Sequence, residues 1–291
     1  MKSGLFLALT MLAMPCIAEP APGIVRHVDA TEPARPLALS IWYPSDSEAS
    51  AIVGGNPVFD GAPAAPGAPI LGGPFPLVIL SHGGLRSATD SGAWLGAALA
   101  RSGFVVVEVN APRPADAAAA LDEIWQRPRD INRAVDAVLN SSDWAGHVDQ
   151  SRISAVGFAL GGTAALAIAG EKLDGQRYRQ SCAEGGMGGP DCVWLAAQGV
   201  TLAQTRSDSL SMLVRDPRFA SAVAIEPEYL AAFEQETAPA DLPVMLISLN
   251  AQPVAGGPLR IVPVPGASIS DAFPVCTAAG VTGHQYRDLR E

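Results

Sequence analysis

Continuous apolar runs, each separated from the next by a segment with helical spacing, constrain the fold of this chain most strongly. The runs FPLVILS at residues 75–81 and FVVVEV at residues 104–109 have no alternating polar face. Such runs are typical of parallel strands that are buried on both faces. Residues 131–139 carry apolar side chains at i, i+3, i+4, i+7 and i+8, the stripe of a helix packed on a sheet. This alternation predicts an α/β fold with a mostly parallel central sheet and helices on both of its faces.

The remaining segments fit the same plan. Residues 35–44 (RPLALSIWYP) alternate apolar and other side chains and are predicted to form a half-buried antiparallel strand. Residues 91–103 have helical spacing and end at a glycine. Proline and glycine throughout residues 54–74 favour a surface connection without a long regular element. Further strands are predicted at residues 152–157, 220–227, 242–250 and 259–266.

The chain begins with a segment typical of a secretory leader. A lysine is followed by a mostly apolar run and by a small-residue site that ends at Ala18; the run is too short for a transmembrane helix. Residues 1–18 are therefore predicted to be a signal peptide, and residues 19–291 a single domain. Within it, residues 171–218 have a weaker pattern and are predicted to be a lid-like insertion over the carboxyl edge of the sheet.

Charge and hydropathy exclude several classes of partner. The net charge is −10 and basic residues form no cluster, which argues against nucleic acid and against anionic membrane surfaces. After the leader, no run of about 18 apolar residues follows. We therefore expect a periplasmic or secreted protein that has no membrane segment after signal cleavage.

Cysteine usage agrees with export. Cys182 and Cys192 flank nine loop residues, a spacing that allows a disulfide in an oxidising compartment. The alternative is a pair of free thiols in a glycine-rich loop. Cys276 is left over as a free thiol, and no nearby histidine pattern supports a metal site.

The segment ISAVGFALGG, residues 153–162, carries the strongest functional signal. It predicts a strand, a glycine-flanked turn and a helix of small residues, which is the layout in which hydrolases present a nucleophilic serine as G-x-S-x-G. Here the central position is Ala159. A methyl group has no lone pair with which to attack a carbonyl carbon.

Several motifs in order resemble one family. LVILSHGG, RPRDINRAVDAVL, HVDQSRISAVGFALGGTAALAIAG and DPRFASAVAIEP, spread over about residues 24–276, resemble the exported dienelactone-hydrolase-like and platelet-activating-factor-acetylhydrolase-like branch of the α/β-hydrolases. The resemblance implies an α/β-hydrolase fold with a serine, a histidine and a carboxylate. It places the nucleophile at Ala159, the acid at Glu226 and the histidine at Ile269, so that only the acid position keeps a suitable side chain.

The resemblance also implies an oxyanion hole. The backbone N–H of Gly84 or Leu85, after the strand that ends in SHGG, would pair with the N–H of Leu160 at the start of the next helix. Such a hole, even if idle in catalysis, could bind a carboxylate or a carbonyl oxygen. The alternative is that the glycines only permit a tight turn.

The four histidines give weaker signals. His82 is expected to bond the backbone near the turn at Ala159. His284 alone follows the acid position in the chain, but it has no nucleophile to activate at Ala159. His27 and His147 have no partner pattern.

Two functions remain. The first is a hydrolase relative without a working triad, retained as a pseudoenzyme that binds a small ester or carboxylate. The alternative is an active exported esterase in which Glu226 or His82 activates water over the oxyanion hole. Neither needs a cofactor or a metal, and the sequence leaves open whether a second copy or a partner chain binds.

Overall fold

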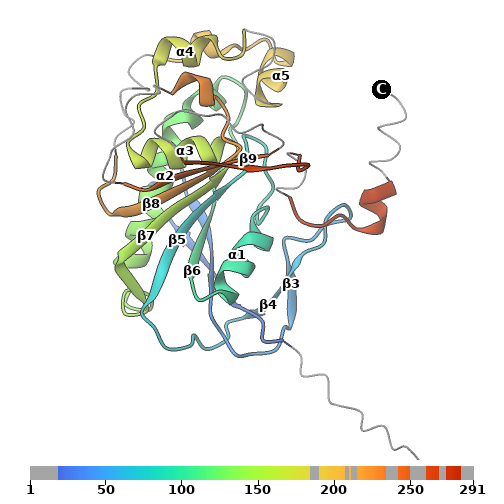
Figure 1. The fold of residues 1–291 in the computed structure, drawn as a ribbon, viewed down its shortest axis with the longest axis vertical. Coiled ribbons are helices and arrows are strands. Elements are labelled where there is room, and N and C mark those ends of the chain that lie inside the picture. Colours follow the sequence, from blue (N-terminus) through green and yellow to red (C-terminus); the bar gives the residue numbers. More distant parts are fainter. Residues whose placement is uncertain are drawn as a thin grey trace, which may run out of the picture.

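The computed structural model describes residues 19–183, 190–206, 210, 215–233, 242–249, 260–268 and 273–282. The predicted signal peptide at residues 1–18, the predicted histidine position Ile269, and His284 lie outside these residues. Within them, the strands form one sheet of order β10-β9-β8-β7-β5-β6-β2-β1-β4-β3 (Figure 1).

The strands are β1 (Gly23–Asp29), β2 (Leu37–Tyr43), β3 (Ala51–Val53), β4 (Ala62–Pro66), β5 (Phe75–His82), β6 (Val105–Asn110), β7 (Val148–Phe158), β8 (Phe219–Ile225), β9 (Val244–Leu249) and β10 (Arg260–Val264). The α-helices are α1 (Ala93–Arg101), α2 (Glu123–Leu139), α3 (Leu160–Ala169), α4 (Gly175–Gln180) and α5 (Pro190–Ala197). Three short 3-10 helices are η1 (Ala119–Asp122), η2 (Leu202–Gln204) and η3 (Leu230–Ala232).

Parallel pairing dominates the sheet. From β6 through β5, β7, β8 and β9 to β10, each strand is parallel to the next, whereas β2 is antiparallel to both β1 and β6. The carboxyl ends of β5, β7 and β8 therefore meet at one edge of the sheet. The predicted α/β fold, a mostly parallel sheet with an antiparallel strand at residues 37–43, is confirmed.

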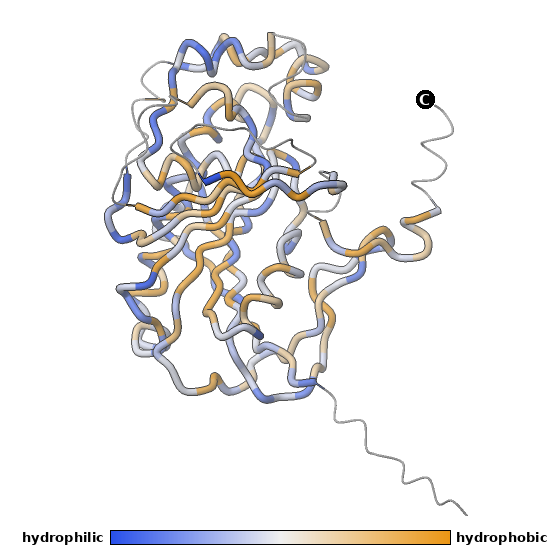
Figure 2. Tube along the Cα trace, viewed as in Figure 1, coloured by the Kyte–Doolittle hydropathy of each residue, from blue (hydrophilic) through white to orange (hydrophobic). Residues whose placement is uncertain are grey.

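Helices cover both faces of the sheet. In β5, Leu77 and Ile79 pack with the buried residues of α2 and α3, and the alternate residues Val78 and Leu80 pack with α1. Figure 2 shows the hydrophobic residues running along the central strands and the hydrophilic ones gathered in outer segments. This two-sided burial explains why the strand sequences show no polar face.

Helix α2 joins the sheet to a network of buried ion pairs. Its predicted apolar stripe is buried, with Ile131 and Val135 both 0% exposed. Glu123 and Asp130 lie next to this stripe, and both accept hydrogen bonds from Arg35 at 2.7–3.1 Å. These contacts fix the segment between β1 and β2 against the helix.

The segment at residues 54–74 differs from its prediction as a connection without regular structure. It contains β4, which pairs antiparallel with β3 and over two residues with β1. Pro63 and Pro66 are tolerated there because a strand near the sheet edge leaves some backbone N–H positions unpaired.

Short helices lie above the carboxyl edge of the sheet, in the region predicted as an insertion. Helices α4 and α5 lie over α3 (Figure 1), and their buried residues pack with Leu85 and Leu160. The predicted disulfide joins Cys182, in the turn after α4, to Cys192 in α5, with an S–S distance of 2.04 Å, and Cys276 is a free thiol. No helix in the described part of the chain is long and apolar enough to span a membrane.

Candidate functional site

A sharp turn, the elbow, connects β7 to α3 at Ala159. This residue has φ 53° and ψ −124°, a backbone conformation that is strained for any residue with a side chain. Two glycines make the turn possible by close approach. A side-chain carbon on Gly157 would lie 2.0 Å from the carbonyl oxygen of Gly161, and one on Gly161 would lie 1.9 Å from that of Ser81. The predicted strand-turn-helix therefore has the geometry of a nucleophile elbow, with a methyl group at its apex.

The immediate surroundings of Ala159 are apolar. Phe158 forms a small buried cluster with it, and Ile225, Leu249 and Phe273 pack against the two. On the backbone side, the carbonyl oxygen of Ala159 accepts the N–H of Glu228 at 3.3 Å. Aliphatic and aromatic carbon thus borders one side of the elbow.

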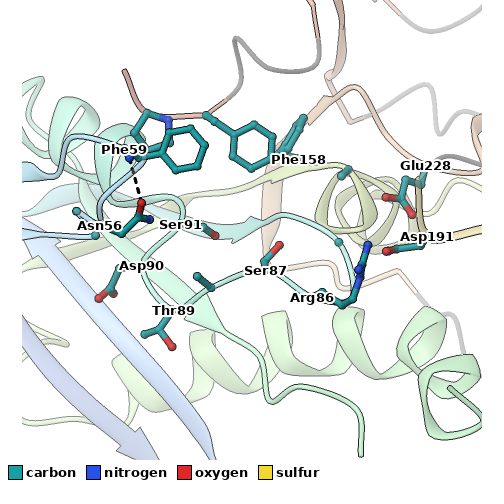
Figure 3. Close-up of a pocket in the computed structure, with 17 residues that line it drawn as sticks. Asn56, Phe59, Arg86, Ser87, Thr89, Asp90, Ser91, Phe158, Asp191 and Glu228 are labelled. Carbon is teal, nitrogen blue, oxygen red and sulfur yellow. Dashed lines mark hydrogen bonds between the residues drawn. The ribbon is translucent and has the colours of Figure 1, made fainter. Parts of the chain in front are cut away.

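The elbow opens onto a pocket of about 650 Å³. Its wall comes from segments that are far apart in sequence: the loop after β3, the loop after β5, the elbow, α5, the turn after β8, and the segment at residues 273–274 (Figure 3). Phe59, Phe158 and Phe273 form an aromatic part of this wall, with ring centroids 5.4–5.8 Å apart. Arg86, Asp191 and Glu228 form a charged part.

One of the three predicted oxyanion donors is already bonded. The N–H of Leu85 donates to Oδ2 of Asp191 at 2.9 Å in a buried contact. Gly84 lines the pocket, and its carbonyl oxygen accepts a hydrogen bond from Arg127 at 3.0 Å. Leu160 is the first residue of α3, directly after Ala159, so its N–H is one of the helix-start donors that lack an intrahelical acceptor.

Asp191 and Glu228 form a pair of buried carboxyl groups beside this loop. Their residues are 4% and 5% exposed, and neither side-chain oxygen of Glu228 makes a hydrogen bond of ordinary geometry to a described residue. A side-chain carbon on Gly84 would lie 2.7 Å from Oδ2 of Asp191 and 3.3 Å from Oε1 of Glu228. Burial, and then the charge of Asp191, raise the pKa of Glu228 to about 8. Near neutral pH Glu228 therefore favours its protonated, neutral form.

The predicted acid residue lies elsewhere. Glu226 directly follows β8 at φ 41°, and its Oε2 accepts the N–H of Leu249 at 2.6 Å. Glu226 is not among the described residues that line the pocket. The structure therefore brings Ala159 together with Gly84, Asp191 and Glu228, and it holds the carboxylate of Glu226 against the end of β9.

Each described histidine is placed by contacts of its own. The ring of His82 packs against Phe158, Phe273 and Trp94, and its Nδ1 lies 3.1 Å from Oγ of Ser91. His82 thus forms part of an aromatic cluster at the end of β5.

The two other described histidines lie in β1 and directly before β7. His27 lies in β1, and the carbonyl oxygen of His147 accepts the N–H of Phe75. Neither is among the described residues that line the pocket.

Sequence reasoning missed Asp191 and Glu228. Asp191 directly precedes Cys192, and this neighbouring disulfide cysteine is a sequence signal that the position of Asp191 is fixed. Glu228 lies two residues after Glu226, and only the fold shows which of the two carboxyls faces the pocket. In the described part of the chain, no group of three or more histidine, cysteine, aspartate or glutamate residues could hold a metal ion.

Comparisons with known proteins agree with an ester-hydrolase relationship over the centre of the chain. Residues 72–176 match the family model described as PET hydrolase-like. Curated relatives include Cutinase 2 of Thermobifida cellulosilytica, 32% identical over 93 residues, and Cutinase est1 of Thermobifida alba, 33% identical over 93 residues. Each alignment covers 31% of this chain and 33% or 29% of the relative, so the chain matches about a third of the length of these proteins.

Two solved esterase structures align over more of the chain at lower identity. A ferulic acid esterase from Streptomyces cinnamoneus gives a TM-score of 0.45 at 20% identity and covers 82% of this chain and 67% of that one. Esterase 2 of Thermogutta terrifontis gives a TM-score of 0.44 at 14% identity and covers 92% of each chain. Both scores are below 0.5, so the fold assignment rests on the sheet and the elbow. The chain has an α/β-hydrolase fold, and its central segment, which includes the elbow, is similar to PET hydrolase-like proteins and cutinases.

Proposed function

We propose that this protein is a relative of carboxylic-ester hydrolases that binds a small molecule in the pocket at Ala159 and does not cleave esters through a serine triad. The observation that carries the proposal is the methyl group at the apex of the elbow. Covalent acyl transfer requires a nucleophile that an adjacent base can deprotonate. Alanine offers neither a lone pair nor a proton.

Asp191 supports the proposal independently of Ala159. Acyl transfer is accelerated by N–H donors that stabilise negative charge on the substrate oxygen. Here the N–H of Leu85 already bonds a carboxylate of the protein itself, at 2.9 Å. A second negative charge at that place would be repelled, so this carboxylate opposes oxyanion formation.

The surroundings of the elbow point the same way. Phe158, Ile225, Leu249 and Phe273 pack at Ala159, and Glu226 is bonded to the backbone of Leu249. A carboxylate held in this way orients a backbone amide, where a triad acid would orient an imidazole. Binding of a small molecule needs only the pocket wall, and that wall does not depend on a catalytic serine or histidine.

We also propose that the protein is exported. The leader-like residues 1–18 and the disulfide between Cys182 and Cys192 support this localisation, because disulfides persist in oxidising compartments.

Turnover of p-nitrophenyl acetate and labelling by a fluorophosphonate probe test the loss of the triad. The expected result is no turnover above that of a heat-denatured sample and no labelled serine. Covalent labelling of any serine in the native protein, blocked by prior denaturation, would refute the proposal.

A rescue experiment tests the two triad positions. Ala159→Ser alone is expected to stay inactive, because a serine hydroxyl without a base is a weak nucleophile. Ala159→Ser combined with Ile269→His is expected to restore measurable ester hydrolysis. Activity of the single variant would show that a base is already present beside the elbow.

An active hydrolase is the second candidate, and the open pocket beside the retained elbow favours it. In this alternative, Glu226 or His82 activates a water molecule that attacks the ester. Glu226→Gln should then lower a saturable esterase rate by about tenfold or more, as expected on removal of a general base. An unchanged rate in that variant and in His82→Gln would leave no role for either residue.

A further inference from the structure

We infer that the carboxyl pair of Asp191 and Glu228 is a subsite for a protonated organic amine, whose apolar body lies along the aromatic wall of the same pocket. This inference rests on the proposed binding function and specifies its ligand.

Unsatisfied hydrogen-bonding capacity is the first argument. Glu228 is 5% exposed and lines the pocket, and neither of its side-chain oxygens makes a hydrogen bond of ordinary geometry to a described residue, although the Asp191 carboxyl and the Tyr229 phenol lie close enough to shift its pKa. A buried carboxyl group without partners costs free energy that a bound ligand can recover by donating to it. Figure 3 shows the carboxyl groups of Glu228 and Asp191 side by side at one end of the pocket. A ligand with several N–H donors fits two adjacent groups that accept hydrogen bonds.

The charges around Glu228 favour a cation over a neutral donor. After burial, the charge of Asp191, from α5, contributes most to the raised pKa of Glu228. Arg127, from α2, lowers that pKa, but its guanidinium is already bonded to Glu123 and to the carbonyl oxygen of Gly84. A bound cation would therefore meet the negative charge of Asp191 and would favour ionisation of Glu228.

Two phenols complete the surroundings of Glu228. Burial, and then the negative charge of Glu228, raise the pKa of Tyr178 and of Tyr229. Both phenols therefore stay neutral near pH 7, and neither adds a charge of its own to the subsite.

Arg86 is the one cation among the described residues that line the pocket, and its charge would favour an anionic ligand instead of an amine. Its guanidinium lies 5.6 Å from the ring centroid of Trp194, in a cation–π contact. If Arg86 dominated the pocket, an anionic ligand would be preferred. The test therefore includes an anion of the same size.

The other end of the pocket supplies apolar surface. Phe59, Phe158 and Phe273 contribute their rings there. Ligand pockets typically combine such a wall with a few polar groups that fix orientation. The structure thus provides an acidic end at Asp191 and Glu228 and an aromatic wall farther along the pocket, where Asp90 is already paired with Arg26.

Isothermal titration calorimetry with three probes tests the inference. Benzylamine, benzyl alcohol and benzoate share a ring and differ in the charge of the polar group. The full-length protein is expected to bind benzylamine about tenfold or more tightly than benzyl alcohol, and benzoate more weakly than either. Asp191→Asn should weaken benzylamine binding by roughly tenfold or more, since it removes a charge from the buried pair. Glu228→Gln should do the same at pH 8 and above, where a large share of the molecules carry an ionised Glu228. Both substitutions keep the side-chain shape, and the amide oxygen introduced by Asp191→Asn can still accept the N–H of Leu85.

Two further measurements separate a local contact from a change in overall charge. Asp46→Asn, at an exposed position, changes net charge by the same amount and should leave the affinity unchanged. Benzylamine binding should strengthen by up to about tenfold per pH unit as pH rises toward 8, because the cation favours ionised Glu228. That slope should disappear in Glu228→Gln.

The outcomes are distinct. Equal or tighter binding of benzyl alcohol or benzoate, no binding of any probe, or an unchanged affinity in Glu228→Gln and Asp191→Asn would each overturn the amine subsite. Ester turnover or serine labelling would overturn the proposed loss of catalysis, and the ranking of the three probes would still decide the amine subsite.

Discussion

Gly161→Ala tests the close approach on which the elbow depends. A side-chain carbon at position 161 would lie 1.9 Å from the carbonyl oxygen of Ser81. An ordinary contact between carbon and oxygen is about 3.4 Å, so α3 would have to move away from β5 by about 1.5 Å. All ten residues of α3 are buried, so this movement would disturb contacts along the whole helix. We expect a loss of about 3 kcal/mol or more in the free energy of unfolding, at the upper end for inserted atoms in a packed core.

Urea unfolding followed by tryptophan fluorescence measures this loss. The matched control is Gly146→Ala, because position 146 has no atom within 4 Å of an added side-chain carbon. The control should be neutral or slightly more stable, since alanine restricts the unfolded chain more than glycine does. If both variants unfold within about 1 kcal/mol of the wild type at an unchanged m-value, then α3 does not lie against β5 as described and the elbow geometry is refuted.

Three further predictions concern the rest of the structure. Burial raises the pKa of Glu108 to about 8, so the unfolded chain loses this proton first and the folded state loses stability as pH rises from about 4.3 to 8. Glu108→Gln should therefore stabilise the protein more at pH 8 than at pH 5, by on the order of 3 kcal/mol in urea titrations; a pH-independent difference would contradict this. Arg35→Met removes the partner of two buried carboxylates and should cost about 3–5 kcal/mol, whereas Arg152→Met, in an exposed pair with Asp149, should leave the urea midpoint unchanged. Replacing Cys182 and Cys192 together with alanine should lower the free energy of unfolding by roughly 2–3 kcal/mol. It should also weaken benzylamine binding, because Asp191 directly precedes Cys192. An unchanged melting temperature and an unchanged affinity would show that the disulfide does not hold Asp191 in place.

The central sheet could be predicted from the sequence because local pattern alone determines it. Strands buried on both faces have continuous apolar runs, and α2 has its stripe of Ile131, Ala134, Val135 and Val138. Strand β4 was missed because its prolines argue against regular structure. Only its place near the sheet edge makes them tolerable.

The candidate site could be predicted only in part. The elbow has a sequence signature, since Gly157 and Gly161 are required by close backbone contacts. The pairing of Asp191 with Glu228 joins residues 37 positions apart through tertiary structure, and no local pattern encodes it. The histidine position at Ile269 lies outside the described residues and stays a prediction.

The positive φ of Ala159 has a practical consequence for work on this protein. The backbone there is fixed by its neighbours and not by the side chain it carries, so the position should accept a different small residue without reshaping the turn. Ala159→Cys would project a thiol into the pocket beside the aromatic wall. A fluorophore or spin label attached to that thiol would then report on whatever molecule enters.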